Sequence, residues 1–300
     1  MASPEAAGSV GTVGAAMRDA TRRLTDAGSP SARLDAEVLL GHVTGRERSW
    51  LLAHPEAPVE SPGSFEAAVL RRAGGEPVAY IRGFKDWHSL RIRTDPRALI
   101  PRPETELLAD ATVAEIEVRL ARAEGPIAAW EVATGSGAVA VVLARRFGHA
   151  IGSGRLGLSA TDVSPEALTL AAENLADHGV ADFVTLALAD LLAPAGDAFP
   201  RPDVVVANLP YVASAEVVAR RGSLGHEPRV ALDGGPDGLD LLRRLLEQAA
   251  GCVAPGATVL LEIGVGQVEV VTTLAPTSAS VSVVPDLAGL DRVVRIEMPD

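Results

Sequence analysis

The sequence predicts an α/β protein in which helices cover both faces of a mostly parallel sheet, preceded by a small helical bundle. Three observations support this prediction: helical patterns fill the first 80 residues, a hairpin pattern follows, and strands alternate with helices from about residue 102. At 300 residues the chain is long for one domain and natural for two. We therefore expect a helical domain over residues 1–80, a hairpin linker over 81–101 and an α/β domain over 102–300.

Composition excludes several classes of protein. The formal net charge of -12 argues against a broad nucleic-acid surface, which needs clustered Lys and Arg. Cys252 is the single cysteine, which excludes a disulfide framework and a thiolate zinc site, and the six histidines show no metal-binding spacing. The Met1 end lacks a signal-peptide pattern, and no apolar run reaches the length of about 20 residues that a membrane span needs. We expect a soluble cytoplasmic protein with no metal and no membrane partner.

The N-terminal part shows four helical patterns. Val13, Met17, Ala20 and Leu24 fall on one face of the first, and glycine stops follow the patterns. Ser31 is the expected N-cap of the second. Since each helix is short and apolar on one side only, they should pack together, either as a stabilising cap or as a substrate-recruiting domain. The four expected helices cover residues 13–28, 31–45, 46–54 and 64–75.

The next segments connect the bundle to the α/β domain and build its sheet. Residues 84–100 alternate as a hairpin does, with an expected turn at the "TDP" of residues 94–96. Ligands of doubly wound sheets bind beyond the carboxyl ends of the strands, so residues there are the candidates for function. Strands are expected at 127–133, 155–163, 182–190, 203–209 and 257–264, with a closing hairpin over 280–298, and helices at 137–148, 164–179, 237–253 and 266–275.

A glycine-rich turn, "EVATGSGAVA", follows the first strand of the α/β domain. Such a turn lets backbone N–H groups approach a ligand at a helix N-terminus. It lacks the GxxxxGKS pattern of a P-loop, and its A-x-G-x-G spacing resembles motif I of S-adenosylmethionine-dependent methyltransferases. The predicted cofactor-binding residues of this turn are Glu131, Ala133, Thr134, Gly135, Ser136 and Gly137.

Acidic residues end the next two strands. Asp162 can accept hydrogen bonds from both hydroxyls of a ribose, and the alternative role, capping the following helix, is already supplied by Ser164 with Pro165 at the first helical position. Asp190, with Leu191 after it, is predicted to border an adenine; an ordinary turn residue is the alternative. Both acids belong to the predicted cofactor site.

The fourth strand runs into Asn208, Leu209, Pro210 and Tyr211. This "NLPY" resembles the [DNS]-P-P-[YFW] motif of methyltransferases that modify a planar nitrogen, either an adenine N6 or a side-chain amide. The Asn208 side-chain oxygen and a backbone carbonyl near Leu209 would accept the two N–H bonds of that nitrogen and favour charge on it. Pro210 would keep the loop rigid and Tyr211 would pack on the planar group. These four are the predicted catalytic and substrate-binding residues, with Asn208 also beside the cofactor.

Further segments make the resemblance specific. "GEPVAYIRGFKDW", "LIPRPETELL", "TDVSPEALTLAAEN", "HEPRVALDGGPDGLD", "LLEIGVGQ" and "DLAGLDRVV" resemble the HemK/PrmC family, the protein-(glutamine-N5) methyltransferases of peptide chain release factors. The resemblance covers nearly the whole chain past residue 70. It implies a Rossmann-like, seven-stranded methyltransferase domain, S-adenosyl-L-methionine as donor, and the glutamine of a release factor's Gly-Gly-Gln motif as acceptor. Glu227 and Arg229 match the family and would shape the acceptor side.

Two positions depart from the family pattern. Ala133 replaces a usual glycine and Leu209 a usual proline. Asn-Leu-Pro-Tyr also occurs in ribosomal RNA adenine dimethyltransferases, but those need a basic face and lack the "PRPETE" segment. Glu104 and Glu106 of that segment are expected to begin a helix rather than to act as acid and base. Open alternatives are a related methyltransferase with another acceptor and a weakened site that only binds partners.

Overall fold

The computed structural model describes residues 11–193, 199–219 and 225–300, which form two compact units. The first unit comprises the described residues up to Gly83 together with Gly225 and His226, and the second comprises the rest from Phe84 on. The first ten residues of the predicted 1–80 domain lie outside the described residues.

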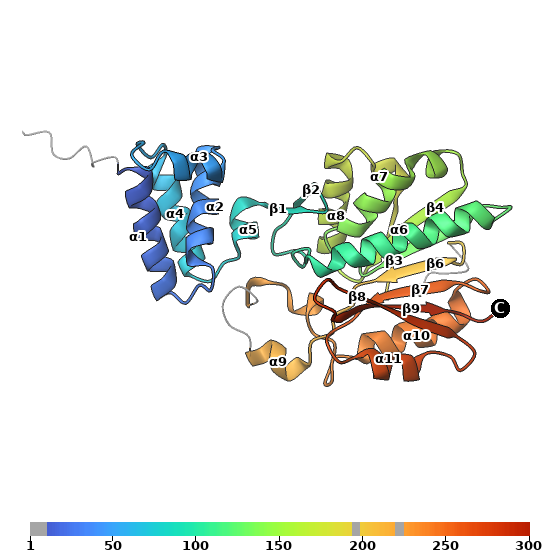
Figure 1. Cartoon of the computed structure of the whole chain (residues 1–300). Coiled ribbons are helices and arrows are strands. Elements are labelled where there is room, and N and C mark those ends of the chain that lie inside the picture. Colours follow the sequence, from blue (N-terminus) through green and yellow to red (C-terminus); the bar gives the residue numbers. More distant parts are fainter. Residues whose placement is uncertain (1–10, 194–198, 220–224) are drawn as a thin grey trace, which may run out of the picture. The chain divides into compact units, whose positions relative to one another are not determined.

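The first unit is a bundle of helices, as the sequence predicts (Figure 1). Its core contains the fully buried side chains Leu24, Leu39, Leu40 and Leu51. The fourth helix begins at Pro62, earlier than expected, and a fifth short helix follows it. The helices are α1 (Val13–Asp26), α2 (Ala32–Thr44), α3 (Arg48–Ala53), α4 (Pro62–Ala73) and α5 (Val78–Arg82).

A buried ion pair joins α2 to α4. Arg72 Nε lies 2.7 Å from Asp35 Oδ2, and both side chains are at least nine-tenths buried. The hydroxyls of Ser29 and Ser31 donate to the same carboxylate at 2.7 and 2.9 Å. Ser31 stands at the N-cap position but makes no capping bond. The prediction of Ser31 as the N-cap residue is confirmed, although its hydroxyl donates to the Asp35 carboxylate instead of accepting from a helix N–H.

The second unit opens with the hairpin of β1 (Phe84–Trp87) and β2 (Leu90–Arg93). His88 and Ser89 form its two-residue turn with φ of 48° and 58°. Positive φ at both central positions is the geometry that suits the twist of paired strands. The chain does turn at the predicted segment, where the Ala98 N–H donates to the Asp95 carbonyl at 3.3 Å, but this turn follows β2 and leads toward α6 (Glu104–Arg122) and is not the turn of the hairpin.

A seven-stranded sheet forms the centre of the second unit, as the family resemblance implies. Its order is β5-β4-β3-β6-β7-β9-β8, with β9 antiparallel to β7 and β8 and the other pairs parallel. The closing hairpin predicted over 280–298 is confirmed as β8 and β9. The strands are β3 (Ile127–Val132), β4 (Leu156–Asp162), β5 (Thr185–Leu188), β6 (Val204–Ala207), β7 (Thr258–Glu262), β8 (Ser280–Pro285) and β9 (Asp291–Glu297).

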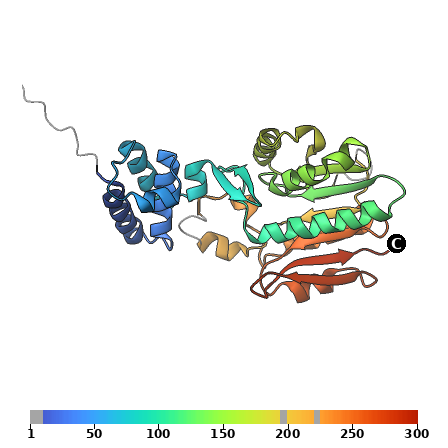
Figure 2. The same cartoon turned by 45° about the horizontal axis from the view of Figure 1, so that its top comes forward.

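Helices cover both faces of this sheet (Figures 1 and 2). Side chains point alternately to the two faces along each strand, so the sheet has one core on each face. Ala129 and Val206 pack on the α6 side. Trp130 and Val205 pack on the other side with Leu245 of α10. Within the described residues, every helix is too short or too polar to span a bilayer. Besides α6, the helical segments are α7 (Ala138–Gly152), α8 (Pro165–Asp177), α9 (Ser214–Ala219), α10 (Asp240–Cys252), α11 (Val268–Leu274) and the 3-10 turns η1 (Ala181–Phe183) and η3 (Arg229–Ala231).

The helix after β4 begins as predicted. The Ser164 hydroxyl accepts from the Ala167 N–H at 3.1 Å, and Pro165 occupies the first helical position, where its missing N–H costs nothing. Because Ser164 caps α8, the carboxylate of Asp162 is not needed for that purpose.

Asn174 of α8 connects three backbone segments through its fully buried amide. It accepts from the Arg93 N–H at 2.7 Å and donates to the carbonyls of Arg93 and Ser136 at 3.1 and 2.8 Å. The hairpin and the glycine-rich turn are thus held against α8 by one side chain. No sequence pattern indicated this role.

Replacing Asn174 with Leu should lower the free energy of unfolding by at least about 2 kcal/mol, because each stranded buried polar group costs about 1–3 kcal/mol. Chemical denaturation of the full chain measures this loss. Asp177→Asn, which alters an exposed ion pair at the end of the same helix, is the control and should change the midpoint little. Equal midpoints for Asn174→Leu and the parent protein would contradict the role assigned to Asn174.

Candidate active site

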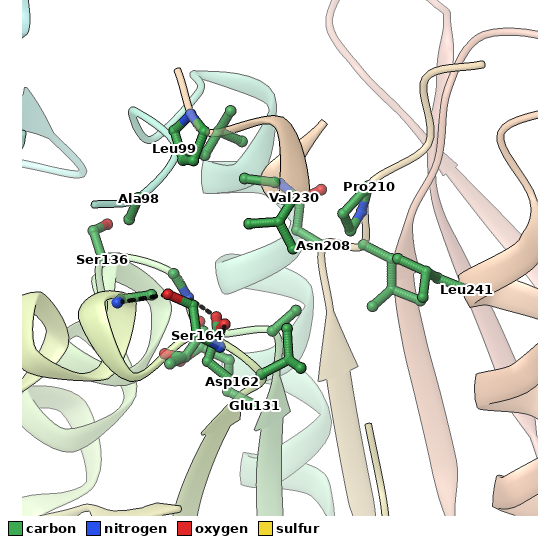
Figure 3. Close-up of a pocket in the computed structure, with 18 of the residues that line it drawn as sticks. Ala98, Leu99, Glu131, Ser136, Asp162, Ser164, Asn208, Pro210, Val230 and Leu241 are labelled. Atoms are coloured by element: carbon green, nitrogen blue, oxygen red, sulfur yellow. Dashed lines mark hydrogen bonds between the residues drawn. The ribbon is translucent and has the colours of Figure 1, made fainter. Parts of the chain in front are cut away.

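A cavity of about 610 Å³ lies beyond the carboxyl ends of β3, β4, β5 and β6. This is the edge where ligands of doubly wound sheets bind. Figure 3 shows Glu131 and Asp162 at the strand ends, with Leu99 and Val230 across the cavity from them. The lining comes from residues 97–105, 131–139, 162–167, 189–191, 206–210 and 228–244, not every residue of each range taking part.

The glycine-rich turn forms one wall of the cavity. Ala133, Thr134, Gly135 and Ser136 line it, while Gly137 caps α7 without facing the cavity. Gly137 has φ of 77°, and a Cβ there would lie 3.0 Å from the Ala171 backbone of α8. The absence of a side chain at Gly137 thus allows α7 to pack closely on α8, and its role toward the cofactor stays a prediction.

Ala133 carries an unusual backbone conformation. Its φ is 58°, in the left-handed region that glycine adopts without strain and alanine does not. A positive φ at this position is the physical reason why the turn favours glycine, as the sequence pattern predicts. The Ala133 residue also lines the cavity, so its methyl group narrows this wall.

Two buried carboxyl groups form the floor. Asp162 Oδ2 accepts from the Gly135 N–H and its Oδ1 from the Ser164 N–H, both at 2.9 Å. The Thr134 hydroxyl donates to Glu131 Oε2 at 2.8 Å. Burial raises the pKa of both acids, to about 8 for Glu131, where the neighbouring charge of Asp162 adds to the effect of burial.

Asp190 and Leu191 line the cavity at the end of β5, as predicted. Asp190 is exposed and forms an ion pair with Arg244 of α10 at 2.5 Å. Leu191 is buried and also has positive φ, at 57°. The role of Asp190 toward an adenine stays a prediction, and Arg244 is a neighbour that no sequence pattern indicated.

Asn208, Leu209 and Pro210 reach the cavity from the end of β6. Asn208 Nδ2 donates to the Thr105 hydroxyl of α6 at 3.0 Å, so the amide nitrogen is directed toward the protein. Its Oδ1 is thereby left as the acceptor that the amide can offer to a ligand. Thr105, in the first turn of a helix that Glu104 begins as predicted, also lines the cavity.

Tyr211 does not line the cavity. Its ring packs on Gly264, where a Cβ would lie 3.2 Å from Tyr211 Cδ2, and burial raises the pKa of its phenol. Gly234 and Gly238 of the "DGGPDGLD" segment let that loop approach the carbonyl oxygens of Pro210 and Tyr211, since a Cβ would come within 2.5 and 2.3 Å. The predicted contact of Tyr211 with an acceptor stays a prediction.

An ion pair holds two walls of the cavity together. The buried carboxylate of Glu227 accepts from Arg102 at 2.6 Å and from the Ile100 N–H at 3.2 Å. The loop from Ala98 to Arg102 is thus joined to the segment that carries Val230. The family resemblance placed Glu227 on the acceptor side, but the apolar lining by Ala98, Leu99 and Leu241 was not predicted.

The charges of the cavity favour a cation. Its lining includes Glu131 and Asp162, which pair with no arginine among the described residues, besides Asp190 and Asp233, which each pair with one. Every arginine of the described lining is paired with a carboxylate, so none contributes a free positive charge to a ligand. The pairs are Arg97 with Asp95 and Glu173, Arg102 with Glu227, Arg229 with Asp233, and Arg244 with Asp190.

Known proteins resemble this chain along most of its length. A family model described as the PrmC N-terminal domain matches residues 15–83. The release factor glutamine methyltransferase of Moorella thermoacetica is 40% identical over 290 residues, covering 94% of this chain and 96% of that protein. The proteins of the same name from Cereibacter sphaeroides and Deinococcus radiodurans are 38% and 36% identical, covering 95% and 93% of this chain and 98% and 96% of the relatives.

The sheet, its glycine-rich turn and the acid that ends β4 define the class of S-adenosylmethionine-dependent methyltransferases. Within this class, the chain belongs to the release factor glutamine methyltransferase family.

The residues present fit S-adenosylmethionine, which combines a sulfonium cation with a ribose and an adenine. Each oxygen of Asp162 accepts one backbone N–H and so keeps a lone pair for a ribose hydroxyl. Glu131 and the backbone from Ala133 to Ser136 would face the methionine part. Leu191 offers an apolar surface for the adenine.

Asp162→Ala should weaken S-adenosylmethionine binding by about 1–3 kcal/mol, through loss of a charge-assisted acceptor. Calorimetry on the folded variant measures this change. Asp162→Asn, which retains one acceptor oxygen, is the matched control and should lose less. Unchanged affinity of the alanine variant would remove Asp162 from the ribose site.

Ala133→Gly should raise the free energy of unfolding by up to about 1 kcal/mol, because relief of left-handed strain exceeds the entropy that glycine adds to the unfolded chain. Cofactor affinity should be equal or higher, since a methyl group leaves the cavity wall. Denaturation and calorimetry test the two parts. Ala133→Val, a β-branched control at the same φ, should lose stability; a loss with glycine would mean that the turn is built differently.

Proposed function

We propose that the chain transfers the methyl group of S-adenosyl-L-methionine to the side-chain amide nitrogen, N5, of the glutamine in the Gly-Gly-Gln motif of peptide chain release factors. The main support for this proposal is the position of Asn208 in a chain of this family. Asn208 lines the cavity, and its amide nitrogen donates a hydrogen bond to Thr105. The names of the relatives support the acceptor, and the cavity beside Asn208 supports the site of reaction.

The binding roles are assigned from the lining of the cavity. Asp162 holds the ribose, and the turn from Ala133 to Gly135 brings its backbone close to the cofactor. Bound S-adenosylmethionine supplies an electrophilic methyl group. The acceptor glutamine enters between the Ala98–Arg102 loop and the segment with Val230, which the Arg102–Glu227 pair holds together.

The acceptor is activated by orientation. An amide nitrogen is a poor nucleophile because its lone pair is delocalised into the carbonyl. The oxygens of Asn208 and Leu209 accept its two N–H bonds, hold the nitrogen in line with the methyl group, and interact more strongly as positive charge develops on it. Pro210 restricts the backbone between these groups and the rest of the loop.

The nature of the acceptor indicates which molecules the enzyme contacts and where in the cell it acts. The acceptor is a protein loop, so no direct contact with nucleic acid is needed, in keeping with a net charge of -12. Release factors act at ribosomes, so we expect the reaction to take place in the cytoplasm. The helical unit that matches the PrmC N-terminal domain would recruit the release factor.

The direct test incubates the full chain with methyl-labelled S-adenosylmethionine and purified release factors, and maps the labelled residue by mass spectrometry. We expect one methyl group on the glutamine of the Gly-Gly-Gln motif. A release factor with glutamate at that position is the matched control and should stay unlabelled. Labelling of ribosomal RNA, or of another residue, would overturn the proposal.

Asn208→Ala should lower kcat by about 10²- to 10³-fold, the usual effect of removing one preorganised electrostatic partner. Cofactor affinity should change little, since the interaction strengthens only in the transition state. The melting temperature should fall, because the buried Thr105 hydroxyl loses a partner. Asn208→Asp keeps acceptor oxygens and should retain some turnover. Near wild-type turnover with a lowered melting temperature would make Asn208 a structural turn residue only.

A further inference from the structure

A buried carboxyl group lies next to Asn208 in the sheet but outside the lining of the cavity. Glu262, the last residue of β7, is 3% exposed and is absent from the cavity lining. Its Oε2 is buried without a hydrogen-bond partner in the described residues. A buried carboxyl group in this state is costly and calls for a reason.

The sheet register explains why Glu262 lies beside Asn208. Parallel β6 and β7 pair Val206 with Leu260 and Ala207 with Leu261, so the next two residues are Asn208 and Glu262. Equivalent positions of neighbouring strands point to the same face. Leu260 and Val206 pack on the α6 side, and Asn208 and Glu262, two residues further on, share that face.

Thr105 of α6 completes the group. It is 6% exposed and accepts from Asn208 Nδ2 at 3.0 Å. The side chains of Thr105 and Asn208 also interact with the Glu262 carboxyl group, where their polar hydrogens favour its ionised form and oppose the rise of its pKa. A hydroxyl, an amide and a carboxyl group from three elements therefore meet at one point.

An asparagine side chain has two orientations of nearly equal shape, which exchange its oxygen and nitrogen. Only the orientation with Nδ2 inward leaves Oδ1 to accept an N–H from the acceptor amide. An ionised carboxylate accepts hydrogen bonds and donates none, so it selects the inward nitrogen. A protonated carboxyl group donates, and it stabilises the reverse orientation with the Asn208 oxygen inward.

The surroundings of Glu262 determine the pH at which the Asn208 amide would change its orientation. Burial raises the pKa of Glu262 to about 7; the Thr105 hydroxyl opposes the rise, Glu104 of α6 adds to it, and Arg292 of β9 and the Asn208 amide oppose it. Tyr211, on the loop after β6, faces the same carboxyl group and has its own pKa raised, first by burial and then by the charge of Glu262.

We propose, resting on the function proposed above, that Glu262 is a positioning residue that acts with Thr105 to fix the amide of Asn208 with Nδ2 inward and Oδ1 toward the acceptor glutamine. Glu262 touches neither ligand. It controls the fraction of the enzyme whose Asn208 oxygen faces the acceptor, and therefore kcat rather than cofactor binding.

The test measures kcat against pH at saturating S-adenosylmethionine with a release factor as acceptor. At saturating S-adenosylmethionine, kcat reports only groups that titrate in the cofactor complex, so titrations of Glu131 and Asp162 that merely alter cofactor binding do not enter it. We expect wild-type kcat at about pH 6 to be roughly one tenth of its value at about pH 8, as for a single ionising group. Glu262→Gln should abolish this limb and lower kcat at about pH 8 by roughly tenfold, because its amide can donate at every pH.

The controls separate positioning from stability. Thr105→Ser keeps the hydroxyl and should retain the wild-type pH profile, whereas Thr105→Val keeps the shape, loses the hydroxyl, and should lower kcat and shift the limb. The KM for S-adenosylmethionine should not move in any variant. If Glu262→Gln does not fold by thermal melt, the two Thr105 variants decide the question by themselves.

Two results would overturn the two proposals separately. Wild-type enzyme that leaves the release factor unmethylated contradicts the proposed function. Wild-type enzyme that methylates it, with the same pH limb in Glu262→Gln or in Thr105→Val as in the parent, contradicts the positioning role alone.

Discussion

The parallel register of β3, β4, β6 and β7 is the constraint on which the site depends. Because parallel strands of one sheet end at the same edge, the residues that follow them are brought together although they lie far apart in sequence. Glu131, Asp162, Asn208 and Glu262 all stand at such ends. The helices that cover the sheet add two further residues to this site. Ser164 caps α8, and Thr105 of α6 accepts a hydrogen bond from Asn208.

Burial of acids is the second property of this edge. Glu131, Asp162 and Glu262 are each less than 9% exposed, and burial raises the pKa of each. Burial of these acids weakens the folded state, whereas Glu131 and Asp162, the two that line the cavity, favour a cationic ligand in their ionised form. The arginines of the described lining are paired with carboxylates, so none of them is free to neutralise the charge of these acids.

Glycines and side-chain hydrogen bonds hold the loops of the site close to the neighbouring backbone. The "DGGPDGLD" segment can lie against the backbone of Pro210 and Tyr211 only because Gly234 and Gly238 carry no Cβ. Asn174 holds the glycine-rich turn by satisfying backbone groups that packing has removed from water. Ala133, by contrast, occupies a left-handed position with a methyl group on the cavity wall.

Local chemistry in the sequence determined the alternation of strands and helices, the Ser164 cap, the start of α6 and the set of strand-end residues, because hydrophobic period, capping and glycine patterns act over a few residues. It misplaced the first hairpin turn, since His88 and Ser89 carry no glycine signal for their positive φ. It identified Ser31 as the N-cap residue of α2, but not the hydrogen bond of its hydroxyl to Asp35.

Only the tertiary structure decided that Tyr211 packs away from the cavity, that Arg244 reaches Asp190, and that Thr105 and Glu262 surround Asn208. The Arg244–Asp190 and Asn208–Thr105 contacts join residues 54 and 103 positions apart in the chain. Over such separations no local pattern carries information about distance, because the order of the strands in the sheet decides which residues meet.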